Sequence, residues 1–396
     1  MEDPRSDPAS WADRLHQAWR RSGLREVLPI YLAVRIGLTL WMFLVRQIFS
    51  QPLPPDPVAR PYLGVEVETN PWLEPWQRWD TLYFQAIAER GYEPFDTALF
   101  TPPLYPALIR LVSNVSNVGT LVGGLLISNL AYVAALTVFY RLAQDELRDQ
   151  AWARRALFYL AIFPSAFFFL AAYTEPLFFL GATGALHAAR HGRWWLSGIA
   201  SAFAAQARLI GALLLAPLGY LAHACFRSTK ARRPLIALGG TIAGAAAFPV
   251  YVWLGLGLSL VAPFEVQSAR FRVGLTFPGV NLLKAIERVL AGDAYFADVF
   301  DLVFMGIFLA LAIPVWRRLS KDLAIYYSSI YFMYLVRVAV PQPLLGSTRY
   351  VLILFPAFLV LAGWGRRAWI HRLIVYLSAI GLLLLSGQFA IWGWVG

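Results

Sequence analysis

Stretches of about 20 mostly apolar residues recur along most of this sequence, and they constrain its fold more than any other feature. A helix of that length crosses the hydrocarbon core of a bilayer. Only 14% of the 396 residues are charged and 59% are hydrophobic, whereas a soluble domain carries about 25% charged residues. The sequence therefore predicts an all-α, polytopic integral membrane protein.

The apolar stretches predict about 11 transmembrane helices, which together form a single domain over residues 28–396. The predicted spans lie near residues 28–50, 116–140, 156–172, 174–190, 194–207, 209–225, 234–262, 299–316, 323–340, 349–364 and 372–394. The stretches within 156–190 and 194–225 are short, so tilted hairpins or partly re-entrant segments are alternatives there.

Polar segments flank and interrupt the predicted spans. Residues 1–27 have apolar side chains at helical spacing among several arginines, which predicts a cytoplasmic amphipathic helix on the membrane surface. Residues 51–115 form a first long outer loop, with a half-buried surface helix over 80–90 and an interfacial or re-entrant segment near 100–111. Residues 263–297 form a second long outer loop.

Lysine and arginine counts predict the orientation. With the N-terminus inside, the inner segments hold 21 of the 34 basic residues and the outer segments hold nine, as the positive-inside rule requires. The same distribution accounts for the net charge of +11 without nucleic acid, because the basic residues lie in short clusters between apolar segments. The compact loops and the high Arg, Ala and Leu content favour a prokaryotic plasma membrane.

Asp80 is the first candidate for chemistry, because it begins the predicted surface helix in the first outer loop. A carboxylate there could cap the helix by accepting its first N–H groups. It could instead act as a general base that takes a proton from an acceptor hydroxyl. Both interpretations stay open at this stage.

Glu175 and several arginines fall on the same predicted outer side. A carboxylate at membrane depth is costly without a partner, so Glu175 is expected to face a polar cavity. Arg208, Arg272 and Arg349 are each typical of a snorkelling arginine. Together they form a set of guanidinium groups suited to a lipid phosphate, with Tyr350 beside them.

Metal and cofactor chemistry finds little support in the sequence. Asp80 has no second acidic residue next to it, the single cysteine excludes an internal disulfide, and none of the five histidines has the spacing of a metal motif. We predict no cofactor and no metal ligand. A divalent metal ion is left as an open alternative, which no motif in the sequence supports.

Several motifs in their order along the chain resemble the PIG-V family of mannosyltransferases. The resemblance begins at Arg78-Trp79-Asp80 in the first outer loop. It continues through Tyr83, Gly91-Tyr92, Phe100, Leu104-Tyr105-Pro106, Tyr173-Thr174-Glu175-Pro176, Gly192-Arg193-Trp194-Trp195, Arg208 and Arg349-Tyr350.

This resemblance implies a GT-C membrane fold and a polyprenyl-phosphate sugar donor, typically dolichyl phosphate mannose. It implies that Asp80 is catalytic, with Arg78 among the phosphate-binding residues. It also implies that four aromatic residues of the same motifs, together with Glu175, contact the acceptor or line the cavity. These aromatic residues are Trp79, Tyr83, Tyr105 and Tyr173.

The resulting hypothesis is an inverting glycosyltransferase that acts on the periplasmic, extracellular or luminal face. Its predicted partners are the polyprenyl-phosphate donor, a lipid-linked or glycolipid acceptor and membrane lipids, and the acceptor's identity is left open. A transporter or flippase of a lipid-linked sugar is the main alternative, and it predicts internal repeats that the sequence does not show. A non-catalytic scaffold is a third possibility, which leaves Asp80 and Glu175 unexplained.

Overall fold

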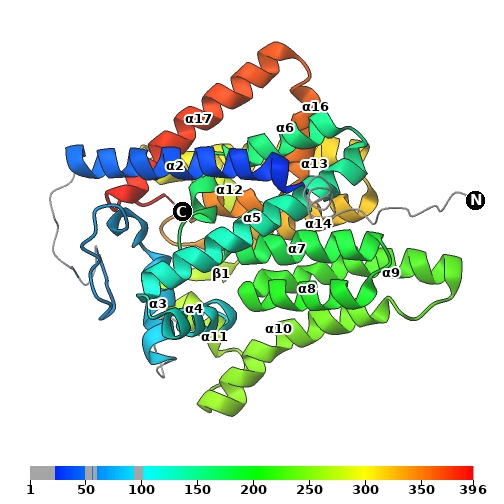
Figure 1. The fold of residues 1–396 in the computed structure, drawn as a ribbon, viewed down its shortest axis with the longest axis horizontal. Helices are drawn as coiled ribbons and strands as arrows, with labels where there is room; N and C mark the ends of the chain where they lie inside the picture. The colour runs from blue at the N-terminus through cyan, green and yellow to red at the C-terminus, as the bar shows by residue number, and fades with distance from the viewer. Residues whose placement is uncertain (1–22, 50–55, 57–59, 93–100, 396) are drawn as a thin grey trace, which may run out of the picture.

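The computed structural model describes residues 23–49, 56, 60–92 and 101–395, and these residues are helical through most of their length. The predicted N-terminal amphipathic helix over 1–27 therefore lies almost wholly outside the described residues. Figure 1 shows the long helices running side by side, with the short helices α3 and α4 gathered at one end of the bundle, which we call the α3 end. The chain begins its first described helix, α2, at the opposite end.

Within the described residues, six helices are long and apolar enough to cross a membrane, and each coincides with one of the predicted spans. They are α2 (Leu24–Phe49), α5 (Thr120–Leu147), η4 with α9 (Leu209–Thr229), α10 (Leu235–Leu256), α13 (Phe296–Arg318) and α17 (Ala368–Ala390). On α2, large apolar side chains every four residues, from Leu32 to Ile48, are 48–69% exposed. A row of exposed apolar side chains at helical spacing is typical of a surface that faces lipid.

The predicted count of about 11 spans is not confirmed. A seventh span is added if two short helical segments at Ser347–Ile353 and Pro356–Trp364, bent by 82° relative to each other, are counted as one. Four other predicted spans are helices of 12 to 16 residues, shorter than the roughly 20 residues that a crossing needs. They are α6 (Gln150–Ala161), α7 (Glu175–Arg190), α8 (Trp194–Ala207) and α14 (Lys321–Val336).

The short helix α7 is apolar because it is packed inside the protein. Most side chains of α7 are buried, and Gly181 on α7 lies against the backbone of Ala200 and Ala204 on α8, where a Cβ would come within 2.8 Å. Gly240 on α10 lies closer still to the backbone of Gly198 on α8, where a Cβ would come within 2.4 Å. Small residues allow such close helix contacts, and an apolar run in sequence does not distinguish this internal packing from a membrane span.

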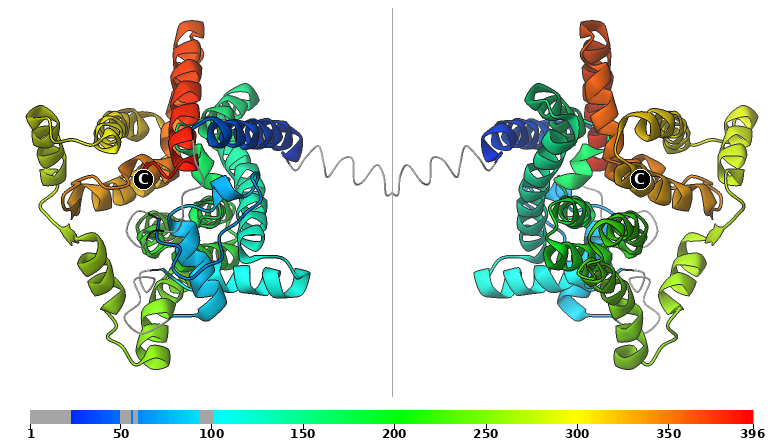
Figure 2. Two further views of the ribbon diagram at one scale, coloured as in Figure 1. Left: turned by 90° about the vertical axis from the view of Figure 1, so that its left-hand side faces the viewer. Right: turned by 90° about the vertical axis from the view of Figure 1, so that its right-hand side faces the viewer.

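The described part of the predicted first outer loop contains the helices α3 (Asp80–Arg90) and α4 (Leu104–Ser116), preceded by the short 3-10 helix η1 (Glu74–Trp76). The expected helix over 80–90 is present with the expected bounds. It is more buried than a half-buried surface helix, since the side chains from Thr81 to Ala88 are all buried. Figure 2 shows α3 lying across the end of the bundle, with α4 beside it.

The second outer loop contains α11 (Ala262–Phe271) and α12 (Val280–Ala291). Between them lies the strand β1 (Val273–Leu275), which pairs antiparallel with β2 (Arg337–Ala339), in the register Val273↔Ala339 and Leu275↔Arg337. This short pairing was not predicted from the sequence, and the predicted all-α class holds for the rest of the described elements. The pairing ties the second loop to the segment that follows α14, and that segment leads to α15 (Ser347–Tyr350).

Candidate active site

A cavity of about 310 Å³ opens near the first residue of α3, and residues from distant parts of the chain line it. Its polar side holds Asp80, Thr174, Arg208, Arg337, Arg349 and Tyr350. Its apolar side includes Leu209, Ile210, Leu213, Phe264 and Met333. The cavity therefore offers one carboxylate and three guanidinium groups next to an apolar wall.

Asp80 accepts a hydrogen bond from Arg349, whose Nη1 lies 2.6 Å from Asp80 Oδ2. Asp80 is the first residue of α3, Trp79 is the N-cap, and no side-chain capping bond forms. The N-cap interpretation of Asp80 is therefore wrong, because the carboxylate is used by the arginine and by the cavity. Trp79 has φ 51°, a left-handed conformation that is uncommon outside glycine, and such strain often marks a functional site.

Glu175, the first residue of α7, holds two of the cavity arginines together. It is 1% exposed, its Oε1 lies 3.1 Å from Arg349 Nε, and the same oxygen is ion-paired with Arg208 Nη1. Arg208 Nη1 also donates to Thr174 Oγ1 at 3.3 Å. Glu175 does not line the cavity itself, so the structure makes it a positioning residue rather than a contact for the acceptor.

Three guanidinium groups gather around the ring of Tyr350. The distances from the guanidinium carbon to the ring centroid are 5.6 Å for Arg208, 5.2 Å for Arg337 and 5.2 Å for Arg349. Three positive charges face the two carboxylates of Asp80 and Glu175, which leaves one positive charge in excess. An excess positive charge in a partly buried cavity favours an anionic ligand, and a guanidinium matches phosphate oxygens well.

Arg337 is the functional candidate that the sequence did not assign. It lies at the end of an apolar stretch, and an arginine in such a place is itself a signal of a functional site. Its Nη1 donates to Leu345 O at 2.8 Å, which fixes the guanidinium beside Tyr350. The sequence alone did not show that this arginine reaches the same cavity as Asp80.

Asp301 positions the short helix that carries Arg349. It is 2% exposed on α13, and its two oxygens accept the backbone N–H groups of Gly346 at 3.2 Å and Thr348 at 2.6 Å. A carboxylate at a helix N-terminus accepts the N–H groups that have no partner in the helix. Asp301 therefore holds α15, and with it Arg349 and Tyr350, against the rest of the bundle.

The expected phosphate-binding role of Arg78 is not supported, because its guanidinium is a link between the first loop and the C-terminal helix. Arg78 is 0% exposed and donates to Ala390 O from Nε at 3.2 Å and from Nη2 at 2.8 Å. Its Nη2 also pairs with Glu74 at 2.6 Å. Burial lowers the pKa of Arg78 from its usual value, and the carboxylate of Glu74 opposes that shift.

The remaining predicted residues also lie away from the cavity lining. Arg272 ends α11 as an exposed residue, and the structure does not bring it to the cavity. Tyr83 is buried against Ile87, and Tyr105 is buried with its hydroxyl 2.8 Å from Ser128 Oγ. Trp79 packs edge-on against Trp392 and Trp394. These positions indicate structural roles for the three aromatic side chains.

Tyr173 lies directly beneath the catalytic candidates. Its hydroxyl accepts the backbone N–H of Asp80 at 3.3 Å and donates to Arg78 O at 3.4 Å. Its ring lies 5.4 Å from the guanidinium carbon of Arg349. Tyr173 thus supports both members of the Asp80–Arg349 pair, and it does not line the cavity.

Taken together, the long apolar helices and this carboxylate–guanidinium cavity define an integral membrane protein with a buried polar site at one end. The family model for "Mannosyltransferase (PIG-V)" matches residues 31–236, which are 206 of the 396 residues. The chain therefore belongs to the PIG-V mannosyltransferase family.

Among solved structures, the chain is similar to the oligosaccharyltransferase of Archaeoglobus fulgidus. One structure, tethered to an acceptor peptide containing the NVT sequon, has 14% identity and a TM-score of 0.41 over 92% of this chain and 54% of that one. The apo form has 15% identity and a TM-score of 0.39, and the match covers 92% of this chain and 55% of that one. The chain spans about half the length of that enzyme. No curated protein sequence matched.

Proposed function

We propose that this protein transfers a hexose, most simply mannose, from a polyprenyl-phosphate-linked donor to a hydroxyl of a lipid-linked or glycolipid acceptor, with inversion at the anomeric carbon. The observation that carries the proposal is Asp80 facing three guanidinium groups in one cavity. Membership of the mannosyltransferase family supports the choice of sugar. The proposal includes a GT-C fold, a cytoplasmic N-terminus and a cavity on the outer face of a prokaryotic membrane.

The cavity walls suit the two halves of such a donor. The excess positive charge near Tyr350 would hold the phosphate through Arg208, Arg337 and Arg349. The apolar wall would take the first part of the polyprenyl chain, because burying hydrocarbon against apolar side chains is favourable. No nucleotide has to enter in this scheme.

In the proposed reaction, Asp80 removes the proton of the acceptor hydroxyl as its oxygen attacks the anomeric carbon. The new bond from carbon to acceptor oxygen forms as the bond from carbon to phosphate oxygen breaks on the opposite face. The proton ends on Asp80, and the lipid phosphate leaves with the bonding electrons. The guanidinium groups stabilise the negative charge that grows on that phosphate.

The ion pair between Asp80 and Arg349 gives the site a way to respond to the donor. Without donor, Arg349 donates to Asp80 at 2.6 Å, which engages the lone pairs that a general base needs. A bound phosphate would compete for Arg349, and Asp80 would then be released toward the acceptor. Glu175 keeps Arg349 close while its partners change, because it contacts the Nε atom rather than Nη1.

The test is sugar transfer from radiolabelled polyprenyl-phosphate mannose to a lipid extract of the source organism, with purified protein in liposomes. We expect wild type to label a new glycolipid and Asp80→Asn to lose roughly 100-fold or more of that activity, within the range for removal of a general base. The exposed residue Asp293 provides the matched control, and Asp293→Asn should transfer normally.

Near-normal transfer by a folded Asp80→Asn variant would refute the role of Asp80. If wild type transfers no label but moves the labelled lipid between leaflets, the protein is a flippase and the proposal fails.

A further inference from the structure

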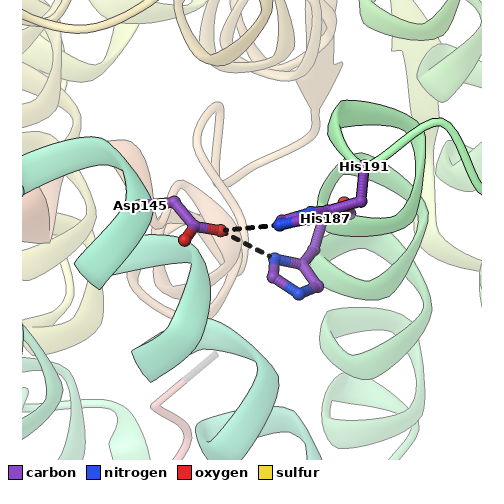
Figure 3. A group of neighbouring side chains, drawn as sticks. All are labelled: Asp145, His187 and His191. Atoms are coloured by element: carbon purple, nitrogen blue, oxygen red, sulfur yellow. Dashed lines mark hydrogen bonds and ion pairs between the residues drawn. The ribbon is translucent and has the colours of Figure 1, made fainter.

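A second group of polar side chains lies at the end of the bundle opposite α3. Figure 3 shows Asp145, near the end of α5, facing His187 and His191 on the last turn of α7 and just beyond it. Asp145 Oδ2 lies 3.2 Å from His187 Nδ1 and 3.7 Å from His191 Nε2. Each of the three residues offers one potential ligand atom, and these three atoms all lie within 4.8 Å of one another.

The spacing of these atoms fits a small divalent cation. A tetrahedral zinc ion with bonds of about 2.0–2.1 Å holds its ligand atoms roughly 3.3 Å apart. The two separations from Asp145 Oδ2 lie on either side of that value. His187 and His191 are four residues apart, so both imidazoles lie on one side of the helix end. This spacing is present in the sequence, although it is not part of a standard metal motif.

The hydrogen bonds of the two rings leave ligand atoms available. His191 Nδ1 lies 2.8 Å from the backbone oxygen of His187. Because a carbonyl can only accept, Nδ1 carries the proton and the lone pair of a neutral ring is on Nε2, the atom nearest Asp145. A second-shell bond of this type orients many metal-binding histidines. His187 Nδ1 is buried and has no hydrogen-bond partner.

Two arginines carry positive charge near the group, Arg141 and Arg190. Arg141 is exposed, one turn before Asp145 on α5. The nearby Arg190 is paired with Glu146, at 2.9 Å from Nη1, and with Asp322, at 2.7 Å from Nε. Its positive charge is therefore balanced by other carboxylates. The side chains of Asp145 and His191 are 41% and 46% exposed, so an ion and one or more water ligands can reach the site from solvent.

We propose that Asp145, His187 and His191 bind one divalent transition-metal ion of the zinc class, which clamps the end of α5 to the end of α7. Two imidazoles and one carboxylate are a common protein ligand set for such ions, and water would complete the coordination. The clamp lies at the far end of the helix whose first residue is Glu175. It is a site separate from the cavity and does not depend on the proposed transferase reaction.

The experiment uses the full chain purified without a histidine tag, stripped with a chelator and then titrated with Zn²⁺. Bound zinc is measured per chain by elemental mass spectrometry, and affinity by competition with a chromophoric chelator. We expect one tight site in wild type, with a rise in Tm that saturates at one equivalent. Asp145→Asn and His191→Ala should each weaken binding at least tenfold, since loss of a second-shell partner alone costs 10–100-fold.

The control is His223→Ala, which removes an exposed histidine of α9 outside the group and should bind zinc as wild type does. Because Asp145 and His191 are partly exposed, the metal-free variants should keep the Tm of metal-free wild type. Co²⁺ gives a second readout through its visible absorption spectrum. The proposal is overturned if wild type binds no zinc, or if both site variants bind it as tightly as wild type.

Discussion

Replacement of Glu175 by glutamine tests how the active site is held together. The substitution keeps the size of the side chain and removes the negative charge that Arg208 and Arg349 share. A hydrogen bond to a charged group contributes about 1.5–3 kcal/mol and a neutral one about 1 kcal/mol. Of the two contacts only the one from Arg208 is a hydrogen bond, whereas Arg349 Nε forms an ion pair without one. Loss of charge assistance in that single hydrogen bond costs on the order of 0.5–2 kcal/mol of unfolding free energy, and loss of the buried ion pair with Arg349 adds to this cost.

The same change should affect turnover more than donor affinity. Removal of one carboxylate raises the excess positive charge of the site from one to two, which does not weaken phosphate binding. The guanidinium groups are then less well placed, and a loss of about 2 kcal/mol in transition-state stabilisation corresponds to roughly a 30-fold fall in kcat. We expect the KM for the donor to stay equal or fall.

The assay combines steady-state transfer kinetics with thermal unfolding of the purified protein. Glu287→Gln is the matched control, because Glu287 is exposed on α12 and its loss should change neither measurement. Glu175→Asp should be only a partial rescue, since a side chain shorter by one methylene reaches both arginines less well. A Glu175→Gln variant with wild-type Tm and kcat would show that the shared carboxylate does not organise the site.

Two arginines, one in the cavity and one outside it, should behave in opposite ways. Arg337→Ala should raise the donor KM about tenfold or more, because it removes a phosphate contact that contributes roughly 1.5–3 kcal/mol. The Tm should change little. An unchanged KM would show that Arg337 does not bind the phosphate. Arg78→Ala should lower the unfolding free energy by on the order of 1–3 kcal/mol or more, because it leaves buried backbone acceptors such as Ala390 O without their donor, and any folded fraction should keep the wild-type donor KM. Glu74 is only half-buried and keeps its ion pair with Arg46. A raised KM in folded Arg78→Ala protein would restore the phosphate-binding role expected from the sequence.

The membrane character of the chain and its main candidate residue could be predicted from the sequence. Apolar runs such as 28–50 and 372–394 became long helices. Asp80 could be singled out by its place at the start of a predicted helix and by the resemblance to the PIG-V family, although helix capping was an open alternative. The sequence could not decide whether the short helices α7 and α14 cross the bilayer, because an apolar run is compatible with lipid on one side or with protein on every side.

Only the tertiary structure decided which residues form the site. Arg349 meets Asp80 across 269 residues of sequence, and Glu175 joins that pair to Arg208 only because α7 begins where both arginines arrive. Arg78 stands two residues from Asp80 and yet serves the C-terminal helix. Apolarity is a property of each residue and its neighbours, so the sequence determined which long helices are apolar enough to cross a membrane. The partners of a buried charge depend on which helices pack together, and only the folded chain decides that.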